Sequence, residues 1–128
     1  MGVEMQEILN VLPLVTDIQL LKSSNTIEFI LDNVQAQAKD YQHSVCVGLL
    51  LCEEKILYDV IFKHISLLFA SLEEAQDYGL ELRKKHWWLW CRADGDIGTN
   101  VEQMASILDQ LLSFRHYLIS LISNHSKN

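Results

Sequence analysis

Residues 55–70 constrain the fold most, because their pattern predicts a helix that is apolar around most of its circumference. At about 100° per residue, the apolar arc covers roughly 240°. The arc includes Leu57, Val60, Ile61, Ile65 and Leu68. A surface helix needs an apolar stripe only somewhat wider than about 100°. This helix is therefore either buried in a core or packed partly against its own core and partly against a partner. In a chain of 128 residues we favour the second arrangement.

The length of the chain predicts one domain, over residues 1–128, with a core of its own. Its net charge of −7 argues against a nucleic-acid partner, because no dense group of Lys and Arg could neutralise several phosphates. No apolar run approaches the about 20 residues that a bilayer span needs. The first ten residues contain two Glu and lack the basic start of a secretory signal. We therefore expect a cytoplasmic protein that does not insert into a membrane.

The periodicities predict an α+β fold in which three helices pack on an antiparallel sheet, in the order α-β-β-β-α-β-β-α. The helices are expected over residues 3–12, 54–71 and 99–123. Strands are expected over residues 17–21, 26–31, 44–52, 78–83 and 87–92. Residues 34–38 also alternate and could extend the sheet. Thr99, with Glu102 three residues later, predicts a capping box at the start of the last helix.

No catalytic, phosphate-binding or metal-binding motif is recognisable in this sequence. Cys46 and Cys52 are expected on one face of a strand, and their spacing is wider than the Cys-x₂-Cys of a zinc site. The turn at Asp94 lacks the Gly and Glu of a calcium loop. We expect reduced thiols, no metal and no cofactor. The enzymatic alternative is a cysteine nucleophile, Cys91 or Cys46, working with a histidine.

Two polar side chains fall on apolar helix faces. His64 lies within the apolar arc and is either a hydrogen-bonded core histidine or a titrating group at a partner interface. Burial at an interface would disfavour its charged form, so the contact would weaken as the pH falls below about 6.5. Arg115 lies between Leu111 and Ile119. Its stem either carries the guanidinium to the surface, or the guanidinium pairs with a carboxylate of the fold or of a partner.

Residues 87–90 place tryptophans on both faces of one strand. Trp87 can join the core, whereas Trp88 and Trp90 must be covered by a helix or by a partner. Because Trp is enriched at interaction hot spots, core packing and partner contact both stay open. The candidate partner-binding residues are therefore Leu57, Ile61, His64, Leu68, Trp88, Trp90 and Arg115.

The order of elements resembles that of class I chaperones of bacterial type III secretion, which are small acidic α+β proteins that usually dimerise. A closer resemblance, to the SpiC/SepD family of type III secretion regulators, rests on three stretches between Ile8 and Lys127. These stretches are Leu12-Pro13-Leu14 with Asp17-Ile18, Asp77-Tyr78 before Leu80-Glu81-Leu82, and Ile122 with Asn124-His125 and Lys127. The Trp-rich strand has no counterpart that we can place in this resemblance.

The resemblance implies a cytoplasmic regulator that works with a gatekeeper protein and a second small chaperone-like protein, near the secretion apparatus. Such a complex holds back effectors until translocators have been exported, and a pH change can trigger the switch. The implied assembly is a homodimer or a heterodimer. The alternative is a class I chaperone that binds the N-terminal segment of a secreted effector along apolar grooves and strand edges.

Overall fold

Six strands and three helices are found in a computed structural model, which describes residues 2–21, 25–71, 77–95 and 100–126. The helices are α1 (Gly2–Asn10), α2 (Asp59–Ser71) and α3 (Val101–Ser126), and a 3₁₀ turn, η1, spans Glu54–Ile56. The strands are β1 (Val15–Leu20), β2 (Thr26–Leu31), β3 (Val34–Asp40), β4 (Ser44–Glu53), β5 (Tyr78–Arg83) and β6 (His86–Asp94). The α+β class is confirmed, with one strand more than expected.

The additional strand is β3, which the sequence indicates only as an extension of the sheet. It pairs with β2 and β4 in a single antiparallel sheet of order β1-β2-β3-β4-β6-β5. Ala36 and Ala38 are buried while Gln35 is exposed, so the alternation of this segment reflects a sheet with one covered and one open face. β1 and β5 are the two edge strands.

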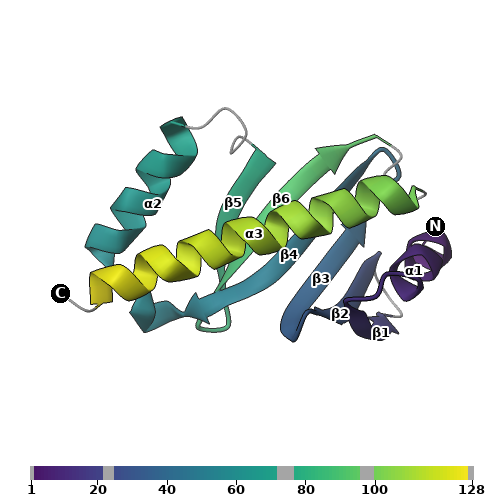
Figure 1. Cartoon of the computed structure of the whole chain (residues 1–128), viewed down its shortest axis with the longest axis horizontal. Coiled ribbons are helices and arrows are strands. Elements are labelled where there is room, and N and C mark those ends of the chain that lie inside the picture. Colours follow the sequence, from purple (N-terminus) through teal and green to yellow (C-terminus); the bar gives the residue numbers. More distant parts are fainter. Residues whose placement is uncertain (1, 22–24, 72–76, 96–99, 127–128) are drawn as a thin grey trace.

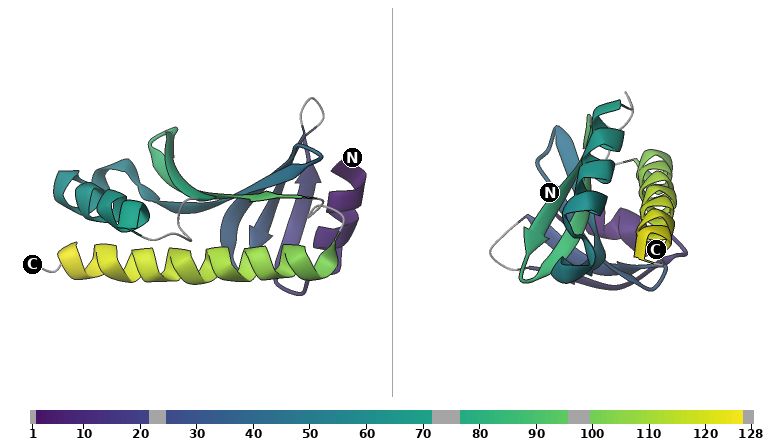
Figure 2. Two further views of the ribbon diagram at one scale, coloured as in Figure 1. Left: turned by 90° about the horizontal axis from the view of Figure 1, so that it is seen from above. Right: turned by 90° about the vertical axis from the view of Figure 1, so that its left-hand side faces the viewer.

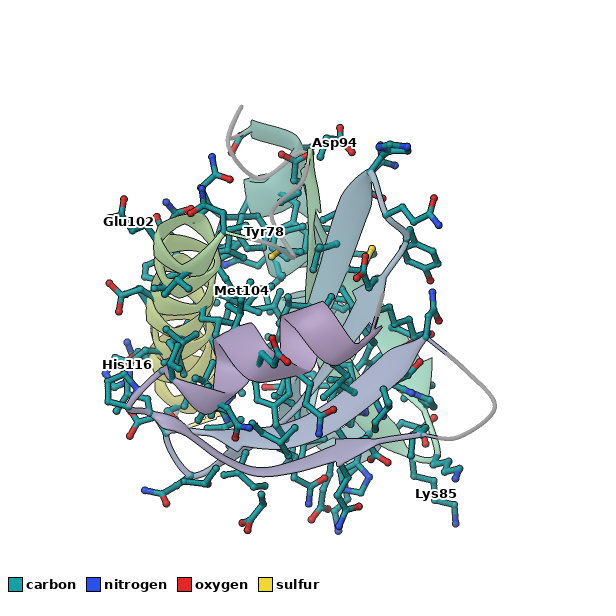
Figure 3. All side chains as sticks on the ribbon, turned by 90° about the vertical axis from the view of Figure 1, so that its right-hand side faces the viewer. Tyr78, Lys85, Asp94, Glu102, Met104 and His116 are labelled. Carbon is teal, nitrogen blue, oxygen red and sulfur yellow. The ribbon has the colours of Figure 1, made fainter. Side chains whose placement is uncertain are left out.

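α3 lies across one face of the sheet and extends beyond it, as Figures 1 and 2 show. α1 lies on the same side of the sheet, near the start of α3 (Figure 3). Apolar side chains of α3, including Met104, Leu108 and Leu111, form the core together with inward-facing residues of the strands, such as Val47 and Leu49. In the described part of the chain, no helix covers the opposite face of the sheet.

α2 begins five residues later than the sequence suggests. The backbone N–H of Glu54 donates to the carbonyl oxygen of Lys85 at 2.8 Å, in the turn between β5 and β6. Leu57, with φ −100° and ψ 79°, then takes a backbone conformation that a helix does not allow. α2 therefore packs beside the C-terminal half of α3 (Figure 2), where the rings of Phe69 and Phe114 lie 5.5 Å apart.

A shift of register in β4, between Leu50 and Cys52, corrects the expected placement of the cysteines. Beyond this bulge, Cys52 lies opposite Trp87 and packs against the core. Cys46 pairs with Arg92 and belongs to the open face. The two thiols therefore lie on opposite faces of the sheet, because one extra residue reverses the alternation of a strand.

Asn100 provides the N-cap of α3, since its Oδ1 accepts a hydrogen bond from the backbone N–H of Gln103 at 2.9 Å. Thr99, the expected cap, lies outside the described residues. The other member of the expected capping box, Glu102, is in the first turn of the helix and is exposed. Among the described helices, none is both long enough and apolar enough to cross a membrane.

Candidate partner-binding surface

The structure divides the apolar arc of α2 into a buried half and an exposed half. Ile61 and Ile65 are fully buried against the core. On the adjacent side, Val60 is 62% exposed and Leu67 is 70% exposed, and the exposed side chain of His64 lies with them. We call Val60, His64 and Leu67 the outer α2 face. This face lines a shallow hollow of about 720 Å³.

The expected partner-binding residues in and before this helix differ in their exposure. Leu57 and Ile61 are only 5% and 0% exposed, because they point into the core of the chain itself. Leu68 is half-buried at the edge of the hollow. His64 is exposed, so any burial of its imidazole would have to come from a partner. A helical wheel shows how wide the apolar arc is. It does not show which half of the arc the sheet and α3 cover.

Arg115 makes a contact that the sequence does not indicate. Its Nε donates a hydrogen bond of 2.7 Å to the carbonyl oxygen of Leu50, at the bulge in β4. Burial lowers the pKa of its guanidinium from the usual value. Arg115 is therefore a half-buried link between α3 and the irregular point of the sheet.

Trp88 and Trp90 lie on the open face of the sheet, where side chains of the chain itself cover them. The two rings stack with their centroids 6.3 Å apart. The guanidinium carbon of Arg83 lies 4.7 Å from the Trp88 ring centroid and 5.6 Å from that of Trp90. Lys39 Nζ is 5.2 Å from the Trp90 ring, whose Nε1 donates to Glu81 at 2.9 Å. Trp88 is consequently only 9% exposed, so neither a helix nor a partner is needed to cover it.

A second apolar surface, which the sequence does not indicate, lies between α3 and the segment that joins α1 to β1. A groove of about 450 Å³ is lined by leucines from several elements and has carboxylates of α3 on its rim. Its lining includes Leu12, Leu14, Leu31, Leu108 and Leu112, together with Glu102 and Asp109. Leu14 is 48% exposed, and β1 beside it is an edge strand. Helical periodicity cannot reveal this groove because its residues come from separate elements.

The thiols show no sign of activation. Burial raises the pKa of Cys91 to about 12 and that of Cys52 to about 11. The pKa of Cys46 is also raised, chiefly by burial. A cysteine nucleophile needs the opposite shift, because the thiolate is the reactive form. Among the described residues, His, Cys, Asp and Glu side chains form no cluster of three that could hold a metal ion.

Several solved structures share the fold of this chain at low sequence identity. The ExsC–ExsE complex matches with a TM-score of 0.69 and 13% identity, over 94% of this chain and 92% of that chain. The HopA1–SchA chaperone–effector complex matches with a TM-score of 0.60 and 16% identity, over 91% and 88%. The Yersinia pestis type III secretion chaperone SycH, in complex with a fragment of YscM2, gives 0.61 and 16%, over 91% and 98%.

These similarities show that the chain has the fold of type III secretion chaperones. No family model matches the sequence, and no curated protein does either. The expected chaperone-like fold is therefore confirmed, while membership of the SpiC/SepD family stays a prediction.

Proposed function

We propose that this chain is a non-enzymatic, protein-binding component of bacterial type III secretion. It acts in a cytoplasmic gatekeeper complex that delays effector export until translocators have been secreted. The outer α2 face is the observation that carries the proposal, and the resemblance to the SpiC/SepD family supports the gatekeeper role. The fold supports the wider role, because each of the three similar structures is a complex with a protein partner.

The physical basis of partner binding is the removal of apolar surface from water. Burying an aliphatic side chain stabilises by about 1.5–3 kcal/mol, so Val60 and Leu67 together could provide much of the driving force of a contact. Both project from one helix whose adjacent face is buried in the core through Ile61 and Ile65. A surface held in this way loses little conformational entropy on binding.

Two aspartate variants on adjacent residues of α2 test the proposal. We expect Leu67→Asp to abolish co-elution with the gatekeeper protein and the second small chaperone-like protein after co-expression, because a carboxylate would be buried in the contact. Ser66→Asp is the matched control, since Ser66 is exposed on the polar side of the same helix. Wild-type chain that elutes alone, or equal loss with both variants, would contradict the proposal.

The position of His64 adds a pH dependence to this proposal. His64 lies between Val60 and Leu67 on the outer α2 face. A partner that covers this face would favour the neutral imidazole, so proton uptake at acidic pH would weaken the contact. We expect His64→Gln to remove the loss of complex between pH 7 and pH 5.5. Unchanged acid sensitivity in this variant would exclude His64 as the sensor.

The groove beside β1 favours a second candidate function, a class I chaperone for a secreted effector. An extended N-terminal segment could pair with the free edge of β1 and place apolar side chains in the groove. Leu14→Asp should then weaken binding of that effector segment, measured by isothermal titration calorimetry. Val11→Asp is the control, because Val11 is 65% exposed but does not line the groove. Effector binding without gatekeeper binding would favour this role.

A further inference from the structure

The turn between β5 and β6 carries four consecutive basic or imidazole side chains, in a chain whose net charge is −7. These are Arg83, Lys84, Lys85 and His86, and we call them the basic turn. Lys84 and Lys85 form its two central residues and both have positive φ, 51° and 68°. Lys85 projects away from the body of the molecule on the side opposite α3 (Figure 3).

A hollow of about 310 Å³ opens on the sheet face beside the basic turn. Three of the four turn residues line it, together with Trp88, Leu50 and the amides of Gln35 and Gln37. Glu28 is the single carboxylate among its lining residues. The hollow lies on the open face of the sheet, opposite α3, and it shares no residue with the hollow at the outer α2 face.

Arg83 is held in position before any partner arrives. Its guanidinium stacks on Trp88 and Trp90, and its Nη1 donates to Gln37 Oε1 at 3.0 Å. Its Nη2 lies 3.4 Å from Glu81, which partly balances its charge. Within the described residues, by contrast, neither Lys84 nor Lys85 has a carboxylate within ion-pair distance. The unbalanced positive charge therefore lies mainly at the tip of the turn, where Lys84 lines the hollow and Lys85 lies next to it in the chain.

From this charge distribution and the hollow, we propose that the basic turn and its hollow form a second docking site, which binds an acidic segment of a partner protein. Carboxylates of the segment face Lys84, Lys85 and His86, and a neighbouring apolar side chain contacts Leu50. A fixed guanidinium and two ammonium groups match carboxylates in charge. The inference goes beyond the proposed function, because it concerns a different face and does not require the outer α2 face.

A synthetic peptide tests the site directly. A fluorescein-labelled peptide of ten alternating Glu and Leu residues should bind the full chain in fluorescence anisotropy, and binding should weaken with added salt. Lys84→Glu should lower the affinity at least about fivefold, because the exposed lysine changes from attraction to repulsion. Lys63→Glu on α2 makes the same change of charge away from the hollow and should alter the affinity less than twofold.

Three outcomes would overturn the proposal. The first is absence of peptide binding by the wild-type chain. The second is an equal effect of Lys84→Glu and Lys63→Glu, which would indicate general electrostatic attraction. The third is tighter binding of a ten-nucleotide oligothymidine than of the peptide, which would assign the site to a nucleic acid. Leu67→Asp should bind the peptide like the wild type, so failure here is distinguishable from failure of the gatekeeper proposal.

Discussion

The indole of Trp90 lies flat against the backbone of Gly48, so that a Cβ at position 48 would stand 2.7 Å from two of its ring carbons. Gly48 and Trp90 are directly opposite each other on β4 and β6. Only a residue without a side chain allows the ring to rest on the central strand. The covering of the open sheet face by Trp90, Arg83 and Lys39 therefore depends on this glycine.

We expect Gly48→Ala to lower the free energy of unfolding by about 1–3 kcal/mol, because the added methyl group must displace a packed ring. Gly79→Ala is the control, since Gly79 flanks Trp90 on β5 but a methyl group there would meet no atom within 4 Å. Urea denaturation followed by Trp fluorescence measures both. Equal stability of the two variants would show that Trp90 moves aside freely.

Arg115→Met should destabilise the chain by about 1–3 kcal/mol, because it keeps the apolar stem and leaves the Leu50 carbonyl without its 2.7 Å donor. Arg92→Met provides the comparison. Arg92 is exposed and pairs with Asp94 at 3.1 Å on the surface, so its loss should change stability by less than about 1 kcal/mol. Thermal unfolding by circular dichroism compares the two, and a smaller effect at position 115 than at 92 would contradict the role of Arg115.

The raised pKa of Cys91 predicts a loss of stability in alkali. The folded thiol has a pKa of about 12, above the ordinary value of 9.0, so the unfolded chain releases its proton first. The protonated Cys91 thiol therefore makes its full contribution to the free energy of unfolding below pH 9, and this contribution is lost as the pH rises toward 12. At pH 10 the thiol should destabilise the fold by about 1.4 kcal/mol relative to pH 8.

Cys91→Ala isolates this contribution. The variant is expected to be less stable at pH 8, because a buried side chain is shortened. Its stability should nevertheless fall less than that of the wild type between pH 8 and pH 10, in urea titrations under reducing conditions. Parallel pH profiles would assign the alkaline loss to other groups.

Asn100→Ala should cost about 1 kcal/mol, because the N–H of Gln103 loses its capping acceptor at the start of α3. The effect should reach the whole fold, since α3 contributes Met104, Leu108 and Leu111 to the core. Gln110→Ala, at an exposed position on the same helix, should change stability by less than about 0.5 kcal/mol. Differential scanning calorimetry of the three proteins measures the difference, and equal melting temperatures would exclude the cap.

Most elements could be predicted from residue patterns, because burial imposes a periodicity on each of them. The stretch 44–52 is apolar on both of its faces, and the structure places it as β4 at the centre of the sheet. Residues 26–31 alternate, and their inward positions, such as Ile27 and Phe29, are buried. These patterns are local, so they can be recognised without knowing which strands pair with one another.

The surface features depend on register and on contacts between distant residues, which no local pattern contains. Arg83 reaches Trp88 and Trp90 because Lys84 and Lys85 alone form the turn, both with positive φ, which is unusual for lysine. The strands expected from the sequence, over residues 78–83 and 87–92, leave three residues between them. Likewise, Arg115 meets Leu50 only because β4 contains a bulge 65 residues earlier in the chain.

The packing of Trp90 on Gly48 has a consequence for the natural history of this chain. Any residue with a side chain at position 48 would compete with the indole for the same volume. Residues 48 and 90 should therefore change together among homologues. Glycine at position 48 should occur with a large aromatic residue at position 90, and a bulkier residue at position 48 with a small residue at position 90. An alignment of genome sequences would then show at which point in evolution this surface acquired its aromatic cover.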